Sequence, residues 1–180
     1  MADIDDFAVL LFEEAKRFFE KARDSNEPEG KEANLHTALL LGVCALEAHI
    51  NAIAEELLLR KDLSILDRSL LSERDYGLDK GVFELSNRLR MYRLEDRLQF
   101  IFKRFTKASS PTTTQWWSGI KAAIDLRNGL THPKTPVTVT QLSVQKSLEA
   151  ILACLNDLYK ALYKKGYPGY ARGMDSKLSF

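Results

Sequence analysis

The stretch "DLRNGLTHP", residues 125–133, places an arginine and a histidine five residues apart, at the end of an apolar helical pattern. Arg127 follows Ile124 by three residues and Ala123 by four, so helical spacing puts its guanidinium on the apolar face of its own helix. A guanidinium keeps its charge, and burying it is costly unless an anion lies beside it. The spacing therefore predicts an anionic partner for Arg127.

One acidic residue on an earlier helical pattern fits this requirement. In "LLLGVCALEAHINAIAEEL", Glu47 falls four residues after Val43 and three before Ile50, which places it on the apolar side of that helix. Asn51 lies one turn further along the same stripe. Glu47 either pairs across helices with Arg127 or lies at the edge of the stripe and meets only water. We expect the pair.

The histidine of the same stretch should lie where its helix ends. Pro133 disfavours helical geometry at His132, so the helix should end near Gly129 or Leu130, leaving His132 on an exit loop that can fold back towards Arg127. Histidine changes its charge near neutral pH, which suits it to acid–base chemistry. The alternative is an ordinary loop histidine without a chemical role.

The elements that must position these residues are helical over most of the chain. Residues 62–84 are less regular, and "PKTPVTVT" is extended because its prolines forbid helix; its Val/Thr alternation is the only strand-like signal that we identify. The pattern predicts an all-α fold, an antiparallel four- to five-helix bundle with this short extended Pro/Val/Thr loop before the last helix. Residues 1–165 form one predicted domain, and 166–180 an irregular tail. Helices are expected at 4–24, 31–60, 85–106, 114–130 and 140–165.

Composition narrows the classes of function. With 45% hydrophobic and 28% charged residues and a net charge of +1, the chain is predicted to be a soluble globular protein that charge alone would not hold on nucleic acid. The sequence shows neither a signal peptide nor an apolar run of the roughly 20 residues that a membrane span needs, so we expect a cytoplasmic protein without membrane contact. Cys44 and Cys154 are interpreted as small core residues.

No cofactor and no metal are expected. His36 and His49 are 13 residues apart, and no Cys/His/Asp cluster has the spacing of metal ligands. A basic segment, "RLRMYRLEDRLQFIFKRFTK", is either a solvated helix face or a surface that contacts phosphates. Under the second interpretation its candidate RNA-binding residues, a weak set, are Arg90, Arg93, Arg97, Lys103 and Arg104.

Taken together, these residues carry a resemblance to a known family. "RNGLTH", Arg127 to His132, resembles the R-x4-6-H motif of the HEPN superfamily of helical-bundle proteins, in which a polar residue such as Asn commonly follows the arginine. "LEAHINAI", Leu46 to Ile53, is similar to the acidic position on an earlier helix of those bundles. The specific part of the resemblance is six residues and Glu47; the rest is the helical plan.

The resemblance implies a metal-independent endoribonuclease, often a toxin or defence component in this superfamily, that acts as a homodimer with its motifs facing each other across the dimer cleft. Arg127 would hold the scissile phosphate, His132 would act as general acid and base, and Asn128 would orient the phosphate or the histidine. Glu47 would brace Arg127, with Asn51 as a second supporting residue. RNA would be the substrate, and an antitoxin or regulatory protein a further partner.

Two other interpretations stay open on sequence alone. The chain could be a non-catalytic HEPN module that binds RNA or nucleotides, or that acts as an adaptor. It could also be a purely structural bundle in which Arg127 and Glu47 form a buried ion pair. Replacing both with apolar residues would separate the structural bundle from the enzyme, because such a replacement can leave stability unchanged or raise it while removing any activity.

Overall fold

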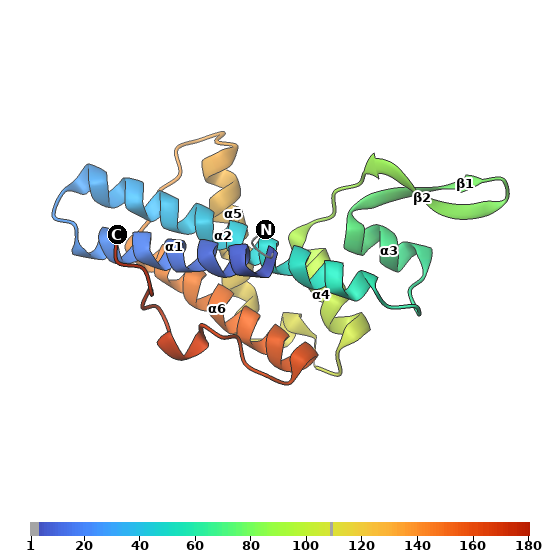
Figure 1. The fold of residues 1–180 in the computed structure, drawn as a ribbon. Helices are drawn as coiled ribbons and strands as arrows, with labels where there is room; N and C mark the ends of the chain where they lie inside the picture. The colour runs from blue at the N-terminus through green and yellow to red at the C-terminus, as the bar shows by residue number, and fades with distance from the viewer. Residues whose placement is uncertain (1–3, 109) are drawn as a thin grey trace.

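The computed structural model describes residues 4–108 and 110–180, with side chains from Asp6 onward. Four long helices pack together: α1 (Ile4–Asp24), α2 (Pro28–Leu58), α5 (Trp117–Thr131) and α6 (Gln141–Tyr163). A smaller unit extends from one end of this bundle (Figure 1). It contains α3 (Ile65–Ser72), β1 (Arg74–Asp79), β2 (Val82–Leu89) and α4 (Leu94–Phe105). The mostly helical fold class is confirmed.

Local signals explain where several helices begin. Pro28 opens α2, a position where its missing N–H costs nothing. Thr140 and Ser143 form reciprocal side-chain bonds that cap α6, and Ser64 and Asp67 do the same for α3. The residue types of "SSPTTT" predict Thr113 or Thr114 as the cap of the following helix, but neither caps it. Those residues lie at a 3₁₀ turn, Pro111–Thr113, and its C-cap, and α5 begins at Trp117.

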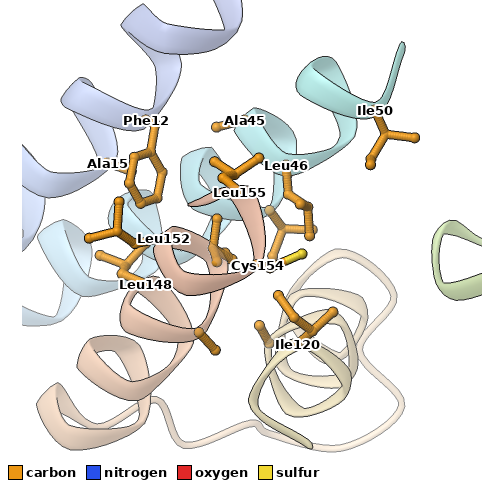
Figure 2. Packing of buried hydrophobic residues seen from close by; sticks show 14 of the residues in the cluster. Phe12, Ala15, Ala45, Leu46, Ile50, Ile120, Leu148, Leu152, Cys154 and Leu155 are labelled. Atoms are coloured by element: carbon orange, nitrogen blue, oxygen red, sulfur yellow. The ribbon is translucent and has the colours of Figure 1, made fainter. Parts of the chain in front are cut away.

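The core lies where the four long helices meet (Figure 2). Phe12 of α1, Leu46 of α2, Ile120 of α5 and Leu155 of α6 are fully or almost fully buried in one cluster. Gly42 of α2 allows close packing there, since a Cβ at this position would stand 2.4 Å from Leu148. This contact brings α6 close to α2, and Ile120 of α5 packs into the same cluster, on the helix that carries Arg127.

The apolar stripe of α1 is displaced from its predicted position. Helical periodicity alone places Phe7, Leu10, Leu11 and Phe18 on one apolar stripe and Leu142 on that of the last helix, but Phe7, Leu10 and Leu142 are exposed. The helix is predicted over the right residues, but it is rotated so that small side chains share the buried face. The buried apolar residues of α1 are Ala8, Phe12, Ala15, Phe19 and Ala22.

A β-hairpin is the main departure from the all-α prediction. β1 and β2 pair antiparallel, with Tyr76 opposite Leu85 and Asp79 opposite Val82. Lys80 and Gly81 form the turn, both at positive φ, as the tight turn between two twisted strands requires. The expectation of a loop at "DYGLDKG" and of helix from residue 85 is therefore wrong. α4 begins only at Leu94, and the predicted strand-like stretch 133–140 contains no strand.

The segment after α6 packs along α1 instead of leaving the bundle. Tyr167 is buried between Phe12 and His49, and its hydroxyl lies 3.3 Å from His49 Nε2. Glu13, fully buried on α1, accepts hydrogen bonds from the Arg172 side chain at 2.8 Å and from the Lys177 backbone at 2.7 Å. Residues 166–180 thus contribute both apolar and charged contacts to the bundle, with one 3₁₀ turn at Tyr170–Arg172.

Two expectations drawn from composition need correction. α2 is long and apolar enough to cross a membrane by length and composition, with a mean hydropathy of 1.6 over 18 residues, whereas no such run was expected. It is nevertheless the central helix of the bundle, and 56% of that window is buried. Cys154 is a core residue as predicted, but Cys44 is exposed on α2.

Candidate functional site

Arg127 and Glu47 meet across α5 and α2. Arg127 Nη2 lies 3.8 Å from Glu47 Oε2, and the side chains are 25% and 36% exposed. The expected cross-helix pair is therefore present, but it lies at the edge of the core and not within it. A contact of this length is an ion pair without a short hydrogen bond, so the guanidinium keeps donor capacity for another anion.

The guanidinium of Arg127 also has an unused donor facing away from water. Its Nε is buried and has no hydrogen-bond partner among the described residues. Cys44, one turn before Glu47 on α2, adjoins the pair. Desolvation raises the pKa of the Cys44 thiol, while nearby Arg127 lowers this pKa and Glu47 raises it. Sequence reasoning did not place a cysteine beside the motif, since the apolar helical pattern around Cys44 indicates a core residue.

His132 and Asn128 lie at the C-terminal end of α5, where both side chains are exposed. The helix continues to Thr131, one residue beyond the predicted end, and the His132 backbone N–H donates to the Asn128 carbonyl at 2.9 Å. His132 itself is non-helical, with φ −132° and ψ 59°, as expected before Pro133. None of the described residues forms a hydrogen bond or ion pair with the His132 imidazole. The motif thus presents a free imidazole at the helix end.

The exit loop returns along the last turn of α5. Gly129 makes this possible, because a Cβ at that position would stand 2.8 Å from Cγ2 of Val137. Val137 and Val139 pack towards the core while the loop between them and His132 is exposed. The path of the backbone after His132 therefore depends on a glycine inside the motif, a role that the motif pattern alone does not assign.

Asn51 has a different partner from the one expected. It lies on the same face of α2 as Glu47, but its Oδ1 accepts a 2.7 Å hydrogen bond from Nη1 of Arg97 on α4. The same nitrogen donates to Glu73 at 3.0 Å, and Arg97 Nη2 lies 3.4 Å from the Leu71 carbonyl. Asn51 is thus tied to a second arginine instead of to Arg127.

The predicted basic surface does not form as one patch. Arg97 is 2% exposed, so it cannot belong to a solvated RNA-contacting face, which corrects that assignment. Arg104 faces the acids before and within α3, at 3.6 Å from Asp62 and 3.5 Å from Asp67. Arg90 pairs with Asp75 on the hairpin, and Arg93 with Glu95. Lys103 is exposed on α4. These residues are therefore distributed over the hairpin and α4, and most have acidic partners.

A hollow of about 680 Å³ lies away from the motif, at the N-terminal end of α5, and is lined by Trp116, Lys146 and Asp157 among others. Trp116 Nε1 donates to Asp157 there at 2.8 Å, which accounts for both side chains structurally. A smaller hollow of about 430 Å³ adjoins Asn51 and Arg97. Among the described residues, no three His, Cys, Asp or Glu side chains are grouped to hold a metal ion.

No family model, curated protein or solved structure matches this chain. The interpretation of the site therefore depends on its own geometry and on the resemblance of the motif.

Proposed function

We propose that this protein is a metal-independent endoribonuclease of HEPN type that cleaves RNA by attack of the ribose 2′-hydroxyl. Arg127 carries the proposal, because its guanidinium is half-exposed, joined to Glu47 only at 3.8 Å, and left with an unpartnered Nε among the described residues. A cation placed in this way can bind a phosphate without breaking a strong internal bond. The free imidazole of His132, at the end of the same helix, supplies an acid–base group.

The chemistry needs few participants. His132 takes the proton from the 2′-hydroxyl, whose oxygen attacks the adjacent phosphorus while the bond to the 5′-oxygen breaks. A proton is delivered to that leaving oxygen, which gives a 2′,3′-cyclic phosphate and a 5′-hydroxyl. Arg127 stabilises the negative charge that builds on the phosphorus-bound oxygens, and Glu47 holds Arg127 in place. Asn128, exposed one position after Arg127, is assigned to orient the phosphate.

The resemblance extends the proposal to the assembly. Two copies would face each other with their motifs across a common cleft, so that a histidine from each copy is available for the two proton transfers. We propose a cytoplasmic role as a toxin or defence component, with an antitoxin or regulatory protein as a second partner.

The test is cleavage of a mixed-sequence RNA with EDTA present, scored for 2′,3′-cyclic phosphate ends. Arg127→Ala and His132→Ala should each reduce the rate by about 10²-fold or more, the usual loss when a charge-stabilising or acid–base group is removed. Arg23→Ala and His36→Ala are matched controls on other surfaces and should cleave as wild type does. Cleavage by no form, or equal cleavage by all, would overturn the proposal, provided that circular dichroism shows folded variants.

A non-catalytic module that binds RNA or nucleotides is the second candidate. The freedom of the His132 side chain favours it, since none of the described residues orients the imidazole as a catalytic base usually requires. Under this alternative, Arg127→Ala would weaken binding of the same RNA, His132→Ala would have little effect, and no form would cleave.

A further inference from the structure

A hollow of about 430 Å³ lies where the N-terminal part of α1 meets α2, α3 and the start of α4. Figure 1 shows these elements converging at the end of the bundle from which the smaller unit extends. The lining combines an aromatic ring with several polar side chains. Its members are Phe7, Ala48, Asn51, Glu55, Leu71, Ser72, Glu73 and Arg97.

The polar side of this hollow is built around a buried arginine. Arg97 is held by Asn51 at 2.7 Å and Glu73 at 3.0 Å, while its own Nε is buried without a hydrogen-bond partner among the described residues. A buried, unpartnered donor in a hollow is costly unless a ligand or water accepts from it. Arg97, which lines the hollow, thus keeps one buried donor that no described residue satisfies.

The hollow and the proposed phosphate site both border α2. Glu47, Asn51 and Glu55 follow one another at intervals of four residues on one face of this helix, so each lies about 6 Å from the next along the helix axis. Glu47 contacts Arg127 and also raises the pKa of Arg97 against the larger lowering effect of burial. A ligand whose one end is at Arg127 can therefore reach the hollow with its other end.

The charges of the hollow indicate which end of a nucleotide fits. Glu55 and Glu73 contribute two carboxylates, whereas the one guanidinium is already bonded to Glu73. Such a lining repels phosphate and favours groups that donate hydrogen bonds. Phe7 is 53% exposed, which leaves part of its ring open for stacking, an interaction that every nucleobase can make.

We infer that this hollow is the base-binding subsite of the site at Arg127, and that it takes the base of the nucleotide whose phosphate Arg127 holds. The inference deepens the proposed function and rests on it. Phe7 stacks on the base, the Glu55 carboxylate accepts from its N–H groups, and Asn51 holds Arg97 in place at the floor of the subsite. Phe7 and Glu55 thus set affinity for the base, whereas Arg127 sets affinity for the phosphate.

Calorimetric titration with the four nucleoside 3′-monophosphates and the four nucleosides tests the subsite without requiring cleavage. Phe7→Ala should weaken binding of both kinds of ligand by about tenfold, and Glu55→Gln should weaken binding of adenosine, cytidine and guanosine more than that of uridine. Arg127→Ala should weaken the monophosphates but not the nucleosides. Phe83→Ala on the hairpin and Glu29→Gln at the start of α2 are exposed controls that should bind as wild type does.

The outcomes separate the subsite from the catalytic proposal. Nucleoside binding that depends on Phe7 and Glu55 supports the subsite even if no form cleaves RNA. Absence of nucleoside binding to wild type, or binding that neither substitution changes, overturns the subsite even if Arg127 and His132 prove essential for cleavage. If RNA is cleaved, Phe7→Ala should raise KM more than it lowers kcat, because the ring contacts a base away from the reacting atoms.

Discussion

Two arginines flank the same face of α2 and differ in almost every physical respect. Arg97, on α4, is 2% exposed and bonds to Asn51, Glu73 and a backbone carbonyl. Arg127, on α5, is 25% exposed and approaches Glu47 no closer than 3.8 Å. Both present an unpartnered Nε within the described structure. The arginine with more internal bonds holds the fold together, and the one with fewer is free to bind a ligand.

Solvation explains this division. Burial lowers the pKa of Arg97, and Glu73 and Glu47 partly offset that shift. Because a guanidinium keeps its charge, the acids around Arg97 are what makes its burial tolerable. Removing either partner would leave an uncompensated buried charge. Water reaches Arg127, so its charge does not depend on Glu47, and their contact contributes little to stability. The structural and functional roles therefore follow from burial more than from the presence of an ion pair.

Arg97→Ala should have the largest effect on stability. It removes a buried guanidinium and leaves Glu73, whose side chain is only 15% exposed, without its cationic partner, so the free energy of unfolding should fall by about 3–5 kcal/mol in urea denaturation. Lys103→Ala, an exposed change on the same helix, is the control. A loss below 1 kcal/mol for Arg97→Ala would contradict the structural role given to this arginine.

Glu13→Gln tests whether burial also makes an ion pair structurally important at a second cluster, formed by Glu13 with Lys16, Arg172 and the Lys177 backbone. Burial by itself raises the pKa of Glu13, but hydrogen bonds from Lys16, the Lys177 backbone and Arg172 together bring it below the ordinary 4.5. Because the pKa of Glu13 is lower in the folded state than in the unfolded state, its carboxylate stabilises the fold at pH values above the unfolded-state pKa. This contribution is lost as the pH falls through the folded-state pKa. At pH 7 the substitution should cost on the order of 3 kcal/mol in urea denaturation.

The pH dependence of stability, compared between wild type and Glu13→Gln, tests the direction of this pKa shift. The difference in unfolding free energy between wild type and Glu13→Gln should shrink as pH falls below 4.5. A difference that stays constant from pH 7 to pH 3 would show that the carboxylate charge is not what the cluster requires.

Gly129→Val sharpens the comparison at the motif itself. The new side chain would overlap Val137, so we expect a loss of about 1–3 kcal/mol and displacement of the loop after His132. The rate of RNA cleavage should fall by more than the loss of folded protein explains, because the backbone of His132 moves. The double variant Gly129→Val/Val137→Ala removes the overlap and should restore part of the stability and part of the cleavage rate. If it restores neither, the overlap with Val137 is not the cause of the losses.

Arg127→Ala should have the smallest effect on stability. A half-exposed pair contributes about 0–1 kcal/mol, so denaturation curves should nearly overlay those of wild type. The double variant Arg127→Met/Glu47→Leu should be as stable or slightly more stable. A loss as large as that of Arg97→Ala would mean that Arg127 is a structural residue and would remove the basis for the proposed phosphate site.

The sequence predicted most of what depends on neighbouring residues. Helical periodicity located α1 and α6 closely, and Pro133 correctly placed a non-helical residue at His132. The pairing of Arg127 with Glu47 could also be predicted, because each residue's spacing fixed the helix face it occupies. The hairpin was missed because its turn, Lys-Gly, is a weaker signal than Asn-Gly, and because the basic segment that follows continues a helical pattern.

What the sequence by itself determined is therefore the helices and the motif block "RNGLTH", since 3.6-residue periodicity, proline and capping residues act over a few positions. Only the tertiary structure decided how deeply each arginine is buried, that Arg97 meets Glu73, and that Asn51 binds Arg97. Those outcomes depend on the angle and register at which α4 and α5 pack against α2, and contacts between residues 46 positions apart leave no local trace in the sequence. Burial separates Arg97 from Arg127, and burial is a property of the packed molecule.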